Sequence, residues 1–237
     1  MNLVKKVTPL FSDVEGTILE ENKPDIKQAF NIEKVNELLN QFDEYQKITD
    51  SKIRLYLVSP MSKPYMVQLL KMLDSAITRY NIRNNSDINI VYSATAEDDL
   101  SNPMHNYYNT DDRIVPYKED SYQLLSYGMV GSGKDAFVNS VLNTLANNKD
   151  LCIENIIYSG NGRNDILSIQ RVNKLKNGFT ICPKNSRRAL KAEVQYASDK
   201  EDCAGFADGM KHINEILKNR YKKINGKDKS QDDDLGR

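Results

Sequence analysis

Two carboxylates follow the first apolar run of the chain, in the stretch FSDVEGT, where Asp13 and Glu15 precede Gly16 and Thr17. A carboxylate at the end of a strand can attack phosphorus and form an aspartyl-phosphate. A second carboxylate two residues later can protonate a leaving oxygen and afterwards activate water. The alternative is an Asx-type turn with a solvated glutamate. Taken alone, the pair is compatible with phosphoryl chemistry or with a surface turn, so the ends of the other strands matter.

Polar side chains also stand where other elements end or begin. Ser59 ends the run IRLYLVS, Asn161, Asn164 and Asp165 lie in SGNGRND, and Lys134 opens a helical pattern. In open α/β sheets, ligands bind outside the carboxyl ends of the strands. Two acidic residues from neighbouring loops can share a Mg²⁺, while a lysine and a hydroxyl balance the charge of phosphoryl oxygens. These residues together form a set suited to a phosphorylated ligand.

The elements that must position this set alternate between β-rich runs and amphipathic helical patterns. The β-rich runs are 8–12, 53–59, 88–92, 153–159, 179–182 and 194–197. Several of them are continuously apolar, as is typical of strands that are buried on both faces. Asn31 is the expected N-cap of the first long helix, whose apolar face comprises Ile32, Val35, Leu38, Leu39 and Phe42. The alternation predicts an α/β fold, a three-layer α/β/α sandwich with a mainly parallel, Rossmann-like sheet.

Two stretches interrupt the alternation. Residues 94–127 are polar, rich in tyrosine and punctuated by Asn-Pro and Val-Pro, which predicts an insertion forming a small cap or lid. Residues 225–237 are charged and lack apolar anchors, which predicts a disordered tail. The predicted core therefore comprises residues 1–93 and 128–224.

Composition narrows the setting of the protein. The 237 residues carry 33 Lys and Arg against 33 Asp and Glu, a balance without an electrostatic footprint for nucleic acid or an anionic membrane. We find no apolar run of spanning length and no signal peptide. Three dispersed cysteines favour neither a zinc site nor a disulfide framework, so we expect a cytoplasmic protein.

Four stretches resemble, in order, the motifs of the haloacid dehalogenase-like (HAD) hydrolase superfamily. They are FSDVEGTIL, LYLVSP, GSGKDAFVNSVL and IIYSGNGRNDI, and the resemblance covers roughly residues 9–216. The later stretch YASDKEDCAGFADGMKHI is similar to the tail of the Cof-type phosphatases of this superfamily. The resemblance implies a HAD-like core and phosphatase activity.

The first and third motifs carry the implied catalytic residues. By resemblance, Asp13 would be the nucleophile and a Mg²⁺ ligand. Glu15 would be the general acid/base, with its main-chain carbonyl on the metal. Lys134 would orient Asp13 and neutralise the phosphate. Thr17 would belong to the same loop and contact the substrate.

The second and fourth motifs carry the implied binding residues. Ser59 would hydrogen-bond the phosphoryl group, although a serine before Pro60 is equally expected as a helix cap. Asp165 would hold the metal directly or through water, and Asn164 would support that loop. Asn161 would be a neutral metal ligand.

The sequence departs from the family pattern at two positions. Glu15 stands where the family usually has Asp, as it does in members of the enolase-phosphatase type. Asn161 stands where the family usually has a metal-binding Asp, and the loss of a full negative charge should lower metal affinity. Asp135 is a candidate for completing the site.

These observations predict a Mg²⁺-dependent hydrolase of small phosphate monoesters that acts through an aspartyl-phosphate. The alternative, motivated by Asn161, is a catalytically impaired HAD-like protein that binds a phosphorylated ligand. A third reading is a nucleotide-binding P-loop, because GMVGSGKD fits Gly-x-x-x-x-Gly-Lys except that Asp135 replaces the Ser or Thr.

Overall fold

The computed structural model describes residues 4–59, 63–88, 92–95, 114–118, 122–126 and 133–232. Most of the predicted cap and the first part of the P-loop-like stretch, residues 128–132, lie outside these ranges. The described strands are β1 (Lys5–Ser12), β2 (Lys52–Ser59), β3 (Tyr92–Thr95), β4 (Ile114–Lys118), β5 (Tyr122–Ser126), β6 (Leu151–Ile153), β7 (Ile156–Ser159), β8 (Gly178–Cys182) and β9 (Tyr196–Ala197). The helices are α1 (Ile26–Ala29), α2 (Ile32–Thr49), α3 (Lys63–Asn84), α4 (Gly133–Asn147), α5 (Ile166–Asn173), α6 (Arg188–Lys191) and α7 (Asp202–Asp232), with a 3₁₀ turn, η3 (Arg163–Asp165), before α5.

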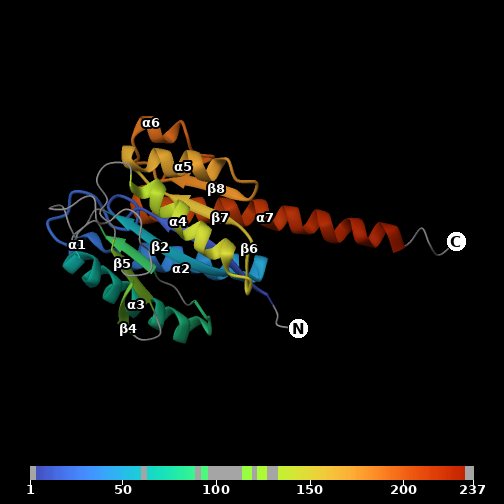
Figure 1. The fold of residues 1–237 in the computed structure, drawn as a ribbon, viewed down its shortest axis with the longest axis horizontal. Coiled ribbons are helices and arrows are strands. Elements are labelled where there is room, and N and C mark those ends of the chain that lie inside the picture. Colours follow the sequence, from blue (N-terminus) through green and yellow to red (C-terminus); the bar gives the residue numbers. More distant parts are fainter. Residues whose placement is uncertain are drawn as a thin grey trace.

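The strands form one sheet in the order β4-β5-β3-β2-β1-β7-β8-β9, and β6 also pairs with β1 (Figure 1). Every described pairing is parallel except that of β4 with β5. In the centre of the sheet, Ser12 of β1 lies opposite Ser159 of β7 and Leu57 of β2. Because parallel strands end at the same edge, the residues that follow β1, β2 and β7 come together.

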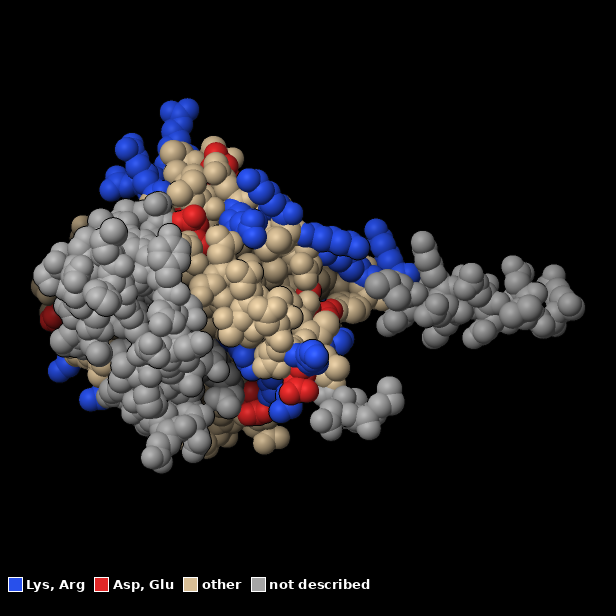
Figure 2. Space-filling model, in the orientation of Figure 1, with Lys and Arg blue, Asp and Glu red and all other residues tan. Residues whose placement is uncertain are grey.

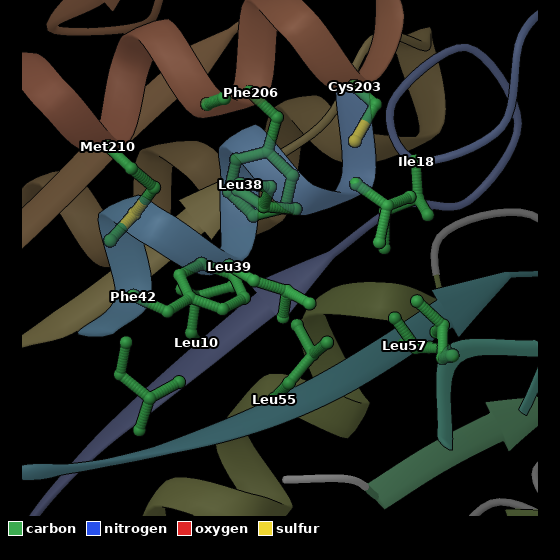
Figure 3. Packing of buried hydrophobic residues seen from close by; sticks show 14 of the residues in the cluster. Leu10, Ile18, Leu38, Leu39, Phe42, Leu55, Leu57, Cys203, Phe206 and Met210 are labelled. Carbon is green, nitrogen blue, oxygen red and sulfur yellow. The ribbon is translucent and has the colours of Figure 1, made fainter. Parts of the chain in front are cut away.

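Alternation along the central strands supplies two hydrophobic cores. Leu10 and Leu55 point to the cluster beneath α2, α3 and α7, whereas the next residues, Phe11 and Tyr56, point to the cluster beneath α4 and α5. Figure 3 shows the first cluster, in which Leu10, Leu55 and Leu57 meet side chains of α2 and α7. Helices therefore cover both faces, and the predicted three-layer α/β/α sandwich with a mainly parallel sheet is confirmed.

The long helices follow their sequence patterns with two differences. The side chain of Asn31 caps α2 by accepting hydrogen bonds from the main-chain N–H groups of Glu33 and Lys34, as predicted. Ile32, expected on the buried face, is 42% exposed because it occupies the first helical position, ahead of the packed turns. At the other end of the chain, α7 continues to Asp232, so the backbone of 225–232 is helical where the sequence predicted disorder.

One predicted strand is arranged differently. The run 153–159 forms the two strands β6 and β7, separated by Glu154 and Asn155. Asn155 is buried and donates a hydrogen bond to the hydroxyl of Tyr45 at 2.7 Å. This polar contact inside the core interrupts the strand, which apolar composition alone did not reveal.

The range 94–127 contributes strands to the main sheet. β3 extends into it, and β4 and β5 pair antiparallel at the end of the strand order. Pro116 lies within β4, an edge strand, where a residue without an N–H group is tolerated. The Val-Pro pair, part of the punctuation that predicted an insertion, therefore belongs to a sheet edge. Whether the other residues of this range form a cap stays a prediction, since they lie outside the described residues.

Candidate active site

The site begins where β1 and β7 end side by side. The main-chain N–H of Asp13 donates to the carbonyl oxygen of Ser159 at 2.9 Å, which continues the ladder by one residue. The side chain of Asp13 lies at this end of the sheet, where its Oδ1 accepts from the main-chain N–H of Val14 at 2.8 Å. Asp13 is only 6% exposed, so this carboxylate is not part of a solvated turn.

Lys134 joins the first motif to the fourth. Its ammonium Nζ lies 2.8 Å from Oδ1 of Asp13 and 2.8 Å from Oδ1 of Asp165. The lysine stands in the first turn of α4 and is 2% exposed. A cation is unfavourable in the first turn of a helix, and here two carboxylates compensate for that position. The structure thus brings together three of the residues that the motifs singled out.

Asp165 is fully occupied by hydrogen-bond donors. Oδ1 accepts from Lys134 Nζ and from the hydroxyl of Tyr158, both at 2.8 Å. Oδ2 accepts from the main-chain N–H groups of Asn161 at 3.1 Å and Gly162 at 2.9 Å. Direct ligation of a metal would require Asp165 to release some of these donors. The geometry favours a role in holding Lys134 and the β7–η3 loop.

Tyr158 is a site residue that sequence reasoning missed. It is completely buried on β7, and its hydroxyl contacts Asp165. The available signal was a single hydroxyl-bearing aromatic residue inside the apolar run IIYS, three residues before Asn161. A buried tyrosine hydroxyl needs a partner, and the nearest strand-end carboxylate provides one.

The charged groups of the site shift one another's pKa values. Burial raises the pKa of Asp13 to about 7; the nearby charge of Asp165 adds to this rise and Lys134 opposes it. Burial alone would lower the pKa of Lys134, but Asp13 and Asp165 outweigh burial and raise it. Burial, followed by the charges of Asp165 and Asp13, raises the pKa of Tyr158 well above its usual value. Lys134 is therefore a permanent cation, and Asp13 is a carboxylate whose negative charge needs further neutralisation.

The loop after β1 places Glu15 at the solvent-exposed edge of the candidate site. Glu15 is exposed, and it forms an isolated bridge with Leu19 as the chain turns back at Gly16. The pKa of Tyr65, in the first part of α3, is raised by burial and then by the negative charge of Glu15. The carboxylate of Glu15 is therefore near that tyrosine. Thr17 is buried, and its hydroxyl has no hydrogen-bond partner among the described residues. An exposed carboxylate two residues from a buried one suits an acid/base group that must exchange protons with solvent.

The remaining predicted residues occupy varied positions. Ser59 is buried at the carboxyl end of β2, next to the end of β1. Asn164 is exposed in η3, with its side-chain amide close to Gly162, and its support of the loop stays a prediction. Asp135 is half-buried in the first turn of α4 and has neither a hydrogen bond nor an ion pair with any described residue. No contact connects Asp135 to Asp13 in the described part of the site.

Asn161 is 7% exposed and held on three sides. Its N–H donates to Asp165, and its carbonyl oxygen accepts from the main-chain N–H of Arg187 at 3.0 Å. Its side-chain amide donates to Oε1 of Glu21 at 2.6 Å. Glu21 is a second residue that sequence reasoning missed, because it lies outside the motif and 140 positions away in the chain.

Basic residues lie on the segment from β8 to α6. Ser186 donates its hydroxyl to the carbonyl oxygen of Gly160, and the N–H of Arg187 reaches Asn161, so this segment lies against the site. Lys184, Arg187 and Arg188 are exposed on it, and Figure 2 shows basic side chains gathered near α6. The surroundings of the site are therefore compatible with an anionic ligand.

The oxygen donors present suit a hard cation such as Mg²⁺. Asn161 could supply its amide Oδ1 and Glu15 its main-chain carbonyl, whereas Asp13 could supply Oδ1 only if Lys134 or the N–H of Val14 releases it. Among the described residues, no group of three or more His, Cys, Asp or Glu side chains has a metal-binding arrangement. The set fits Mg²⁺ with fewer charged ligands than the family pattern implies.

No helix in the described part of the chain is both long and apolar enough to cross a membrane.

Comparison with known proteins identifies similar structures only. No family model matches the chain, and no curated protein matches it. The structure is similar to 3-deoxy-D-manno-octulosonate 8-phosphate phosphatase from Moraxella catarrhalis, solved in complex with magnesium ion, phosphate ion and KDO molecule. The identity is 12%, the match covers 93% of this chain and 92% of that one, and the TM-score is 0.49.

Two further similar structures have comparable values. The cobalt-bound deoxy-D-mannose-octulosonate 8-phosphate phosphatase from Haemophilus influenzae is 10% identical, with 92% of this chain and 91% of that one covered and a TM-score of 0.47. A Legionella pneumophila protein described as a HAD superfamily (subfamily III A) hydrolase is 12% identical, with 93% and 92% covered and a TM-score of 0.46. These values assign neither a reaction nor a substrate to this chain. None of the three is described as Cof-type, so that finer resemblance stays a prediction.

Proposed function

We propose that this protein is a Mg²⁺-dependent phosphate monoester hydrolase of the HAD type that acts through an aspartyl-phosphate on Asp13. The observation that carries the proposal is the buried Lys134 between Asp13 and Asp165, with Glu15 two residues beyond Asp13. The lysine holds the carboxylate of Asp13 at the carboxyl end of the parallel strands. It also brings a positive charge to the place where phosphoryl oxygens would lie.

The first step uses the free oxygen of Asp13. Lys134 Nζ and the N–H of Val14 both bind Oδ1, so Oδ2 is held by no described donor. Oδ2 attacks phosphorus in line, and the bond from phosphorus to the alcohol oxygen breaks. Glu15 transfers a proton to that oxygen, so the leaving group departs as a neutral alcohol.

The second step reverses the role of Glu15. The ionised glutamate takes a proton from water, and the water oxygen attacks phosphorus. The bond to Oδ2 of Asp13 breaks, which releases inorganic phosphate and restores both carboxyl groups. Bound Mg²⁺ would neutralise phosphoryl charge and lower the pKa of Asp13. In this proposal Thr17 and Ser59 would contact phosphoryl oxygens; the buried hydroxyl of Thr17, which has no partner among the described residues, supports its part.

The test replaces the nucleophile. Asp13→Asn should lower hydrolysis of p-nitrophenyl phosphate in Mg²⁺ by at least about a thousandfold, because the neutral amide cannot form the covalent intermediate. The matched control is Glu37→Gln, a charge-neutralising change on the exposed side of α2, which should keep wild-type activity. Circular dichroism should show that both variants are folded. Hydrolysis that survives unchanged in Asp13→Asn would rule out this mechanism.

A second candidate function is supported by Asn161 and by the absence of a three-carboxylate cluster in the described residues. In this reading the protein binds a phosphorylated ligand without turnover. Calorimetric titration separates the two: no Mg²⁺ binding at millimolar concentration, together with no hydrolysis, would favour the binding protein.

The P-loop reading has less support. Its lysine should be free to reach a triphosphate, whereas Lys134 is buried and shared between two carboxylates. Substitution of Lys134 without any effect on ATP affinity would exclude it. The cytoplasmic location stays a prediction.

A further inference from the structure

The chain that follows β1 returns to the site before it enters α1. The N–H of Gly16 donates to the carbonyl oxygen of Leu19 at 2.8 Å, which closes a tight turn. Gly16 has φ of 70°, a left-handed conformation that favours glycine. The turn brings Glu21 over Gly16 and against Asn161, although Glu21 belongs to none of the four motifs.

Gly16 also makes room for this contact. A Cβ atom at position 16 would overlap the amide nitrogen of Asn161 and the carboxylate of Glu21. The side chains of Asn161 and Glu21 therefore meet in space that a larger residue would fill. Their hydrogen bond is 2.6 Å long and links the first motif loop to the fourth.

The chemistry of this hydrogen bond determines how the amide is oriented. An ionised carboxylate only accepts hydrogen bonds, so Asn161 must present its NH₂ group to Glu21. The amide oxygen Oδ1 is then directed away from Glu21 and is available to a cation. Without Glu21, either end of the amide could face the cation position.

Glu21 is itself held in place. Its main-chain N–H donates to the carboxylate of Asp202, and the N–H of Asp202 donates to Oδ1 of Asn185 at 2.9 Å. Asn185 also donates to the carbonyl oxygen of Gly16 at 3.0 Å. These bonds fasten both ends of the turn to the segment that follows β8 and to the first residue of α7, so the position of Glu21 does not depend on its side chain alone.

We infer that Glu21 is a positioning residue for the divalent cation: it orients the amide oxygen of Asn161 and supplies the negative charge that an aspartate at position 161 would carry. This inference rests on the Mg²⁺ site of the proposed function. It explains why a neutral residue can stand at position 161, since the carboxylate of Glu21 lies next to it and accepts a hydrogen bond from its amide. The site would then have the same negative charge as one with aspartate at position 161, but carried by Glu21.

The test relocates that charge. Magnesium binding is measured by calorimetry, without substrate, for the wild type, Glu21→Gln, the double variant Glu21→Gln/Asn161→Asp and the control Glu37→Gln. Glutamine both removes the charge and can donate to Oδ1 of Asn161, so Glu21→Gln should weaken Mg²⁺ binding about tenfold or more. Aspartate at 161 returns the charge, so the double variant should recover to within about threefold of the wild type. The control should bind as the wild type does.

Each other outcome has a definite meaning. Wild-type affinity in Glu21→Gln, or no Mg²⁺ binding by the wild type at millimolar concentration, would overturn the inference. A weakened Glu21→Gln that the second substitution fails to rescue would overturn the relocation of charge. Thermal melting confirms that each variant is folded. Because hydrolysis is assayed separately, Glu21-dependent Mg²⁺ binding without turnover would reject the proposed function and leave this inference standing.

Discussion

At the scale of single residues, the candidate site depends on one cation. Lys134 pairs with both Asp13 and Asp165, and almost no solvent reaches any of the three side chains. Removing one partner of a buried ion pair leaves an uncompensated charge, which costs far more than losing a pair at the surface. The lysine therefore links the stability of the fold to the chemistry of the site.

Lys134→Met should lower the free energy of unfolding by about 3–5 kcal/mol at pH 7, because two buried carboxylates lose their counter-ion. Phosphatase activity should be lost as well. The matched control is Lys47→Met, which removes a lysine that is 70% exposed and paired with Asp43, and should cost at most about 1 kcal/mol. Urea unfolding measures both variants. Equal costs for the two would show that Lys134 does not carry this role.

Asp13 and Asp165 are both strand-end acids in the sequence, yet their surroundings separate their functions. Asp165 accepts four hydrogen bonds and has no oxygen left over. Asp13 keeps Oδ2 free of described donors. In the proposed mechanism, the number of donors around each carboxylate would distinguish the reacting Asp13 from the positioning Asp165.

At the scale of elements, the chain between β1 and α2 is fastened by a small ionic network. Glu20, whose side chain is 17% exposed, accepts from Lys34 Nζ at 2.8 Å and from Asn31 Nδ2 at 3.2 Å, and Lys23 lies 3.2 Å away. The hydrogen bond from Lys34 is the main cause that lowers the pKa of Glu20 to about 2. Because Glu21 follows directly, this network also supports the contact to Asn161.

The network predicts a pH-dependent stability. The pKa of Glu20 is lower in the folded state, so its contribution is present above its ordinary pKa of 4.5 and disappears as the pH falls through about 2. Glu20→Gln should destabilise the protein by about 1–2 kcal/mol at pH 7, after allowance for solvent screening. The difference from the wild type in thermal or urea unfolding should narrow between pH 4.5 and pH 2. A difference that is constant with pH would contradict the assigned cause.

At the scale of the whole molecule, the last helix completes the core that supports the site. Phe206, Met210, Ile213 and Leu217 of α7 are buried in the cluster shared with α2 and the sheet (Figure 3). Phe206 meets Phe42 of α2 in an edge-to-face contact with ring centroids 6.0 Å apart. The N-terminal and C-terminal parts of the chain are thereby joined in one core.

Phe206→Ala should lower the free energy of unfolding by about 3–5 kcal/mol, since it removes a fully buried ring and leaves a cavity. Ile82→Ala, at a position that is 80% exposed, is the control and should change stability by less than about 0.5 kcal/mol. Denaturant unfolding should shift its midpoint without a change in slope. A small effect at Phe206 would mean that α7 packs loosely on the rest of the fold.

The sequence by itself determined what depends on neighbouring residues. Apolar periodicity located the long helices and the central strands, and Asn31 was identifiable as a cap. Polar residues after strands indicated Asp13 and Asp165, and the start of a helical pattern indicated Lys134. These features are set within a few positions along the chain, by side-chain direction and local hydrogen bonding. The α/β fold class followed from their alternation.

Only the tertiary structure decided which of these residues meet. Pairing of β1 with β7 brings Asp13 to the start of the loop that holds Asn161, and the return of the chain after Gly16 brings Glu21 to the amide of Asn161 across 140 positions. The buried hydroxyl of Tyr158 and the four donors around Asp165 follow from the same packing. Strand order and loop path are set by how the two cores fill, which no local pattern encodes. For this reason the neutral residue at position 161 looked like a missing charge in the sequence, whereas in the fold a carboxylate stands one hydrogen bond away.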